Sequence, residues 1–169
     1  MIRQFVPESA CLKCAGCCRF KEADSVWLPC LLNEEAQELA DREGIPAVSI
    51  SIDKKIQPKP NPGGEGFVCA FLGCKDNKCG VYRFRPFECQ LYPFLINLRN
   101  KRVLLTVDLN CPYIKDHLNS KELNEYIDYL VSFLNSSAQI KILKNNPQLL
   151  QAYEEVSEIV ELKLSDEIK

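Results

Sequence analysis

The pattern of apolar and polar positions changes along the chain from short extended runs to a helical stripe. Residues 67–72, 93–98 and 102–107 are apolar runs of strand length. The last two are joined by the polar residues Arg99-Asn100-Lys101, which is typical of a hairpin with Asn100 at its tip. In residues 123–134, apolar side chains recur at the spacing of one helix face. The pattern therefore predicts short strands and one hairpin, followed by a helical region.

Helix-capping and helix-breaking residues indicate where further helices, strands and loops begin and end. A helix is expected to begin at Asn33, with acidic residues in its first turn, and to run to about Glu43. Pro86 is expected to open a short helix that ends near Leu91. A short strand is expected over residues 25–28, and a loop over the Pro- and Gly-rich residues 59–66.

The C-terminal part is predicted to be helical. Asn119 followed by Glu122 fits a capping box at the start of the first helix. A second helix is expected to begin at Asn146-Pro147 and to continue through Val160. The tail after about Lys163 is expected to fray.

These elements predict an α+β fold built around a metal. We expect a small cysteine-rich domain with short strands and one hairpin over residues 1–117, and a C-terminal helical extension over residues 118–169 packed on it. Hydrophobic residues make up 46% and charged residues 26% of the chain, the profile of a soluble globular protein. The net charge of −2 favours neither nucleic acid nor an anionic membrane as the main partner. No apolar run approaches the roughly 18 residues needed to cross a bilayer.

Ten cysteines and one histidine change this picture most. The N-terminus has no apolar signal-peptide core, which predicts a cytoplasmic location. In a reducing cytosol, clustered thiols indicate metal binding or catalysis rather than a disulfide scaffold. Four of the cysteines lie within eight residues, in the run Cys11-Leu12-Lys13-Cys14-Ala15-Gly16-Cys17-Cys18.

The spacing within that run is informative. Its first three cysteines follow C-x2-C-x2-C, which lets one turn present three sulfurs to one iron–sulfur cluster. Adjacent side chains generally point in different directions. Cys18 is therefore expected either at a second centre or beside the ligands of the first.

Two assignments of the thiols remain open. In one, the first three cysteines and a distant thiol bind a [4Fe–4S] cluster, and Cys111 is the candidate because a proline follows it. Cys18 then belongs with Cys69, Cys79 and Cys89, at a second centre. In the other, some of the thiols form all-cysteine zinc sites. The gaps between the later cysteines are longer than the short knuckles of zinc sites, which favours iron–sulfur.

The segment 79–93 completes a recognisable pattern, C-x-x-Y-x-x-R-P-x-x-C-x-x-Y-P. Its matching residues are Cys79, Tyr82, Arg85, Pro86, Cys89, Tyr92 and Pro93, and Gln90 stands where an arginine is usual. With the opening C-x2-C-x2-C-C, a loose Gly-to-Leu element at residues 66–72, and Cys111-Pro112, the chain resembles the CxxCxxCC family of zinc- or iron-chelating domains. The resemblance covers roughly residues 11–115.

The resemblance implies a set of metal ligands: Cys11, Cys14, Cys17, Cys18, Cys69, Cys79, Cys89 and Cys111. It leaves Cys30 and Cys74 outside that set. A related domain occurs in flagellin lysine N-methylases, which implies iron–sulfur and methyl-transfer chemistry in some relatives.

Residues beside the cysteines are candidates for tuning the centre. Arg85 is expected to offset the negative charge of a thiolate-bound cluster, or to bind a carboxylate. Tyr82 and Tyr92 are expected to shield the centre from water or to donate a hydrogen bond to sulfur. His117, the only histidine, is expected at the surface rather than on the metal.

Three functions are compatible with these features. The favoured one is a cytoplasmic protein with one or two [4Fe–4S] clusters that serves electron transfer or a cluster-dependent redox reaction, with a redox or substrate protein as partner. The second is a zinc-binding interaction module without catalysis. The third is an enzyme related to the flagellin methylases, although the chain shows no methyltransferase motif. Whether the chain is an enzyme stays open, and an iron–sulfur oxidoreductase is the candidate class.

Overall fold

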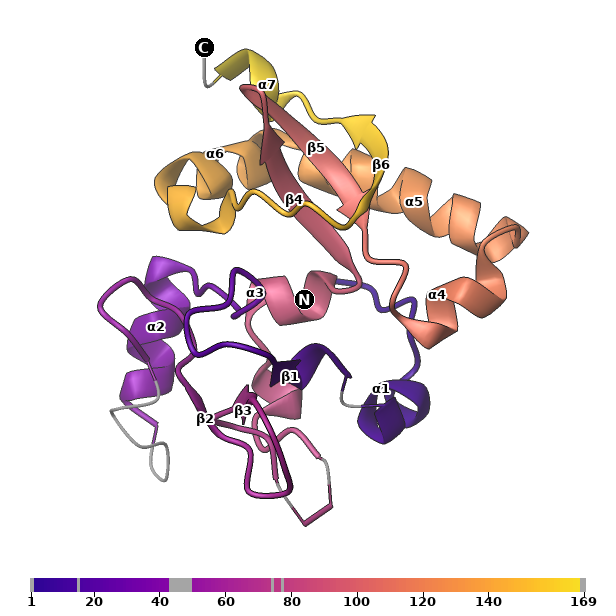
Figure 1. The fold of residues 1–169 in the computed structure, drawn as a ribbon. Coiled ribbons are helices and arrows are strands. Elements are labelled where there is room, and N and C mark those ends of the chain that lie inside the picture. The colour runs from indigo at the N-terminus through magenta and orange to yellow at the C-terminus, as the bar shows by residue number, and fades with distance from the viewer. Residues whose placement is uncertain (1, 15, 43–49, 74, 77, 168–169) are drawn as a thin grey trace. The chain divides into compact units, whose positions relative to one another are not determined.

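The computed structural model describes residues 2–14, 16–42, 50–73, 75–76 and 78–167 (Figure 1). The chain forms two compact units, Met1–Gln90 and Leu91–Lys169. Each contains short helices and one three-stranded antiparallel sheet, so the predicted α+β class is confirmed. Among the helices that the structure describes, none is both long enough and apolar enough to cross a membrane.

The first unit has a sheet in the order β1-β3-β2. Its strands are β1 (Arg19–Phe20), β2 (Pro58–Pro60) and β3 (Phe67–Cys69), and its helices are α1 (Glu8–Cys14), η1 (Gly16–Cys18), α2 (Asn33–Ala40), η3 (Tyr82–Phe84) and α3 (Phe87–Leu91). Strand β2 holds two prolines, which lack the backbone N–H group, and this is tolerated because β2 is an edge strand.

Gly66 brings strand β3 close to β1. Its φ angle is 78°, and a Cβ atom there would lie 2.6 Å from the carbonyl oxygen of Phe20. The close approach of the two strands therefore requires glycine at this position.

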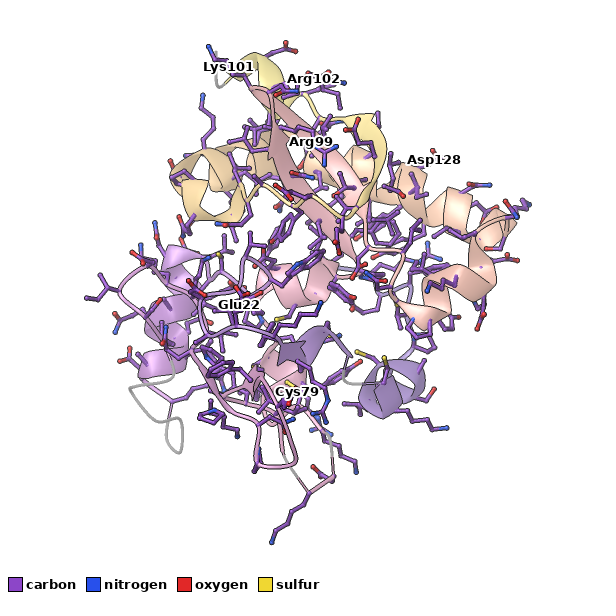
Figure 2. The ribbon with its side chains drawn as sticks, in the orientation of Figure 1. Glu22, Cys79, Arg99, Lys101, Arg102 and Asp128 are labelled. Atoms are coloured by element: carbon purple, nitrogen blue, oxygen red, sulfur yellow. The ribbon has the colours of Figure 1, made fainter. Side chains whose placement is uncertain are left out.

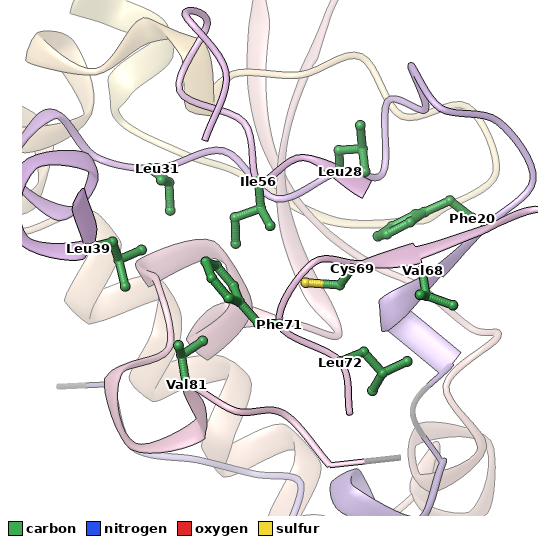
Figure 3. Close-up of a cluster of buried hydrophobic side chains, with 10 residues drawn as sticks. All are labelled: Phe20, Leu28, Leu31, Leu39, Ile56, Val68, Cys69, Phe71, Leu72 and Val81. Atoms are coloured by element: carbon green, nitrogen blue, oxygen red, sulfur yellow. The ribbon is translucent and has the colours of Figure 1, made fainter. Parts of the chain in front are cut away.

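The core of the first unit forms beside the sheet (Figure 3). Its buried side chains are Phe20, Leu28, Leu31, Leu39, Ile56, Val68, Cys69, Phe71, Leu72 and Val81. Figure 3 shows the Cys69 side chain lying among these apolar groups. The partly buried Cys18, Cys79 and Cys89 pack against the same cluster. The hydrophobic core and several of the predicted metal ligands therefore share one region.

Two local predictions in the first unit need correction. Residues 25–28 are not a strand but a turn, because the Ser25 hydroxyl accepts from the Trp27 N–H and the Ser25 carbonyl from the Leu28 N–H. Helix α2 begins at Asn33 as expected, but its N-cap is Leu32, whose N–H donates to the Glu35 carboxylate. The helix ends at Ala40 with Asp41 as its C-cap, so it is shorter than the predicted run to about Glu43, a residue that lies outside the described ones.

The second unit has a sheet in the order β4-β5-β6, and Figure 1 shows α5 and α6 along one face of it. Its strands are β4 (Phe94–Arg99), β5 (Arg102–Val107) and β6 (Ser157–Glu161), and its helices are α4 (Pro112–His117), α5 (Lys121–Leu134), α6 (Ser137–Asn145), η4 (Pro147–Leu149) and α7 (Leu164–Glu167). The predicted hairpin β4–β5 is confirmed. Asn100 and Lys101 at its tip have φ angles of 52° and 62°, and a tight two-residue hairpin turn requires such positive φ angles at its two central residues.

Helix α5 covers the sheet with its apolar stripe. Leu123, Tyr126, Leu130 and Leu134 are buried, and the ring centroids of Tyr126 and Phe94 lie 5.4 Å apart. The N-cap is Ser120, whose hydroxyl accepts from the Leu123 N–H, rather than the predicted Asn119.

The predicted second C-terminal helix is wrong. Only the short η4 follows Asn146, and residues 157–161 form strand β6. This strand pairs with β5, which would otherwise present unpaired backbone groups at that edge. Arg99 and Arg102 on the hairpin (Figure 2) also form ion pairs with Glu158 and Glu161 of β6, both at 2.8 Å.

Two further segments differ from prediction. Helix α6 was not predicted from the sequence; Ser136 acts as its N-cap and accepts from the Gln139 N–H. The tail does not fray immediately after Lys163, because Leu164 and Ser165 of α7 are buried. The Ser165 hydroxyl accepts from the Val103 N–H and thereby ties the tail to β5.

Candidate metal centre

The opening cysteine run folds as two helical turns. Cys11 and Cys14 lie on α1, three residues apart and therefore on one face of the helix. Cys11 is half-buried and Cys14 is exposed. A Cβ atom at Gly16 would lie 3.2 Å from the Cys14 sulfur, so glycine leaves room for this thiol. The two thiols of α1 are therefore presented side by side near the surface.

Cys17 and Cys18 end the adjacent turn η1. An interaction with the Cys17 side chain is the largest cause that raises the pKa of the Cys18 thiol.

Four thiols from separate segments form one neighbourhood, which we call the four-thiol group: Cys18, Cys69, Cys79 and Cys89. They come from η1, β3, the segment before η3, and α3. A charge on Cys18 acts on each of the other three members, and all four contact the hydrophobic core of the first unit. The fold thus brings together thiols that lie 51 or more positions apart in the sequence, such as Cys18 and Cys69.

The thiols of this group are held in their neutral form by their surroundings. Burial raises the pKa of Cys69 to about 12, and it raises those of Cys79 and Cys89, with the neighbouring thiols adding to the effect. The hydrogen bond to Cys17, followed by burial, raises the pKa of Cys18. Several thiolates in such a place would need a cation beside them.

Arg85 supplies one cation at this site. Its Nη1 donates to the Cys11 sulfur at 3.8 Å, and its Nη2 donates to Gln4 Oε1 at 2.9 Å. The guanidinium lies over the Tyr82 ring, 3.9 Å from the centroid. The charge of Arg85 also lowers the pKa of Cys18 and Cys79, against the other effects. Arg85 therefore acts both on α1 and on the four-thiol group.

Cys111 and Tyr92 belong to the second unit. Cys111 is buried and is the N-cap of α4, and its N–H donates to the Asp108 carbonyl oxygen. The Tyr92 hydroxyl donates to the Asp108 carboxylate at 2.7 Å. The same carboxylate accepts from the Asn110 N–H. The hydroxyl of Tyr92 is thus used to hold the turn that leads to Cys111.

Residues outside the predicted ligand set have other roles. Cys30 is fully buried in the first unit, and burial raises its pKa to about 12. His117 lies in the last turn of α4, where its ring stacks on Tyr113 at 4.1 Å and its Nδ1 lies 2.7 Å from the Tyr113 carbonyl oxygen. Cys74 lies outside the described residues.

Two carboxylates near the cysteines were missed by the sequence analysis. Glu35 of α2 accepts from the Phe87 N–H at the start of α3, and Glu88 of α3 accepts from the Cys30 N–H. Both fix the segment that carries Cys89. Nothing in the local sequence marks Glu88, since its partner lies 58 positions away.

The donor chemistry of the four-thiol group fits a metal that prefers sulfur, such as zinc or iron in an iron–sulfur cluster. The described cysteines are all free thiols. Among the described residues, no group of three or more cysteine, histidine, aspartate or glutamate side chains is arranged to hold a metal ion. The side chains of the group would therefore need to rotate to share one metal.

Comparison with known proteins agrees with this chemistry. The chain is 28% identical over 103 residues to an uncharacterized protein of Methanocaldococcus jannaschii, covering 59% of this chain and 52% of that protein. It thus spans about half the length of that relative. No solved structure matches the chain. Residues 10–164 match the family described as "CxxCxxCC: Putative zinc- or iron-chelating domain", and the chain belongs to that family.

Proposed function

We propose that the chain is a cytoplasmic iron–sulfur protein. Its first centre is held by the four-thiol group of Cys18, Cys69, Cys79 and Cys89. Cys11, Cys14 and Cys17 supply ligands to a second centre, and Cys111 is a further ligand that the family resemblance implies. The observation that carries the proposal is that four thiols from distant segments gather against one hydrophobic core.

The surroundings of the four-thiol group suit a cluster that exchanges electrons. An iron–sulfur cluster, when bound, accepts and releases one electron at a potential set by charge, hydrogen bonds and exposure. Cys69 is buried among apolar side chains, which keeps water from that sulfur. Arg85 carries the positive charge that offsets thiolates on both sides. We assign the chain to electron transfer or to a redox reaction with a partner protein.

Two tyrosines have positioning roles in this proposal. Tyr82 holds the guanidinium of Arg85 by stacking under it. Tyr92, through Asp108, holds the turn before Cys111. Substituting Tyr92 by Phe therefore tests whether that turn contributes to metal binding, because the ring is kept while the hydroxyl is lost.

Metal analysis tests the proposal directly. After anaerobic isolation, we expect iron and acid-labile sulfide in the wild-type protein and visible absorption that bleaches on reduction. Cys89→Ser removes one thiol of the group and should lose most of the iron of the first centre. Cys30→Ser is the matched control, because Cys30 is buried in the same unit but lies outside the ligand set, and it should keep the metal.

Two outcomes would overturn the proposal. A colourless protein with zinc and no sulfide would exclude iron–sulfur. Equal loss of metal in Cys89→Ser and Cys30→Ser would show that the thiols act through packing rather than as ligands. Cys111→Ser separately tests the second centre: it should lower iron without abolishing it, and unchanged iron would remove Cys111 from the site.

A zinc-binding module is the second candidate. The observation in its favour is that the four-thiol group offers four sulfur donors, which satisfies the closed tetrahedral shell of a structural zinc site. In that case a chelator should unfold the first unit, while oxidants and reductants of moderate potential should leave the absorption spectrum unchanged.

A further inference from the structure

A small pocket of the first unit is lined by Arg85, the residue whose Nη1 donates to the Cys11 sulfur. It is lined by Gln4, Tyr82, Arg83, Arg85 and Gln90, and its volume is about 40 Å³. One water molecule needs about 10–15 Å³ on the same measure, so the pocket holds about three water-sized groups. It therefore suits the head group of a small molecule rather than a whole cofactor.

The pocket lining is cationic and rich in hydrogen-bond donors. Arg83 and Arg85 contribute guanidinium groups, Tyr82 a phenol and Gln90 an amide, whereas the Gln4 amide N–H groups already donate to the carbonyl oxygens of Ile2 and Gln90. None of the lining residues is acidic. Glu8 is near enough for its charge to act on Tyr82, but it does not line the pocket. Such a lining favours an anionic ligand.

Arg85 is held in a fixed orientation, as binding of a planar anion requires. Its guanidinium stacks on Tyr82, its Nη2 donates to Gln4 Oε1, and its carbonyl oxygen accepts from Gln90 Nε2 at 2.7 Å. Its Nε atom is buried and has no hydrogen-bond partner among the described residues. An arginine whose side chain is already ordered loses little conformational entropy when it binds a ligand.

Arg83 complements this fixed group. It lies on η3, two positions before Arg85, and its side chain is exposed. No ion pair among the described residues uses either arginine. Arg83 can therefore turn toward an anion in the pocket without giving up such a partner.

We propose that this pocket binds the oxyanion end of a small molecule, either a carboxylate or a phosphate group. Arg85 forms the fixed base of the site, Arg83 closes it from the solvent side, and the Tyr82 hydroxyl and the second N–H of the Gln90 amide donate hydrogen bonds. Because Arg85 also donates to Cys11, the bound anion lies next to α1. The site does not depend on which metal the cysteines hold.

The test uses titrations of the full chain with inorganic phosphate and, in a separate arm, with acetate, at constant ionic strength kept with chloride. The readout is the chemical shift of backbone amides and of the Arg85 Nε–H group in ¹H–¹⁵N spectra. Saturable shifts confined to residues of the pocket are expected. The anion with the lower midpoint identifies the head group.

Arg83→Gln removes one charged donor without touching a cysteine contact. A hydrogen bond to a charged group contributes about 1.5 kcal/mol, so the midpoint should rise about tenfold. Lys101→Gln, on the hairpin tip of β4–β5, is the charge-matched control and should change the midpoint less than twofold.

Two results would overturn the proposal. One is that neither anion gives a saturable shift at the pocket. The other is that Arg83→Gln and Lys101→Gln change the midpoint equally, which would indicate a general effect of net charge. Metal content is measured in parallel: Arg83→Gln should leave it unchanged, so failure of the anion site is distinguishable from failure of the metal proposal.

Discussion

Glu35 connects the start of α2 to the start of α3, and its replacement should destabilise the first unit. One carboxylate oxygen accepts from the Leu32 N–H at 2.9 Å and the other from the Phe87 N–H at 2.6 Å. In Glu35→Gln, one oxygen remains as acceptor while the amide group faces an N–H donor. One hydrogen bond is lost and one donor is left unpaired, which costs about 1–3 kcal/mol of the free energy of unfolding.

The pH dependence of this effect has a defined sign. Burial, the largest cause, raises the pKa of Glu35, although the two backbone hydrogen bonds oppose it. The folded state therefore binds the proton more tightly than the unfolded state, in which the pKa is about 4.3. The proton-linked part of the stability that Glu35 supplies is fully present below that value and is lost as pH rises through the folded-state pKa. The penalty of Glu35→Gln should accordingly grow on acidification.

Urea unfolding at several pH values measures this effect. Trp27 is the only tryptophan of the chain and packs against the core of the first unit, so its fluorescence reports that unit. Glu34→Gln is the matched control, because Glu34 is an exposed acid of the same helical turn. It should cost less than about 1 kcal/mol. A penalty for Glu35→Gln that equals the control, or that shrinks on acidification, would refute the reasoning.

Three further predictions concern other parts of the chain. Asn97→Ala should lower the free energy of unfolding by about 2–4 kcal/mol, because the buried Asn97 amide donates to the Tyr153 carbonyl oxygen and accepts from the Tyr153 N–H. A thermal or urea melt followed by circular dichroism measures the change, and a value below about 1 kcal/mol would contradict the prediction. Gly66→Ala should cost at least about 2 kcal/mol on the Trp27 signal, since the new Cβ would meet the Phe20 carbonyl at a positive φ, whereas Gly63→Ala, whose nearest contact is 3.6 Å, should cost less. Metal binding to the metal-free protein at pH 7 should release protons from the thiols of the four-thiol group, because burial holds their pKa values high. A pH indicator in weak buffer measures this proton release. If no protons are released, those thiols are excluded as ligands.

In the C-terminal half, the local sequence pattern was not sufficient to predict the secondary structure. Val156 and Val160 fit a helical stripe that begins at Asn146, but residues 157–161 form strand β6. The free edge of β5 and the ion pairs of Arg99 and Arg102 select the extended form. These partners lie 50 or more positions away, so no window of local sequence contains them.

The sequence by itself determined the α+β class, the hairpin at Asn100, the start of α2 and the cysteine-rich motif of the family. Each of these features depends on residues that are close in the chain. The signals are the period of the hydrophobic positions, a hairpin residue that tolerates positive φ, the acidic first turn of a helix, and the fixed spacing of the cysteines. The metal-binding character follows from the same spacing.

Only the tertiary structure decided which side chains meet in the first unit. It gathers Cys18, Cys69, Cys79 and Cys89 at one hydrophobic core, and it places Arg85 where it donates to Cys11 while its charge acts on Cys18 and Cys79. Such contacts arise when the apolar faces of separate segments are buried together, and the energy of that burial depends on the whole core rather than on any one segment. The opening run from Cys11 to Cys18 could therefore be recognised in the sequence, whereas its neighbours are set by the packing of the fold.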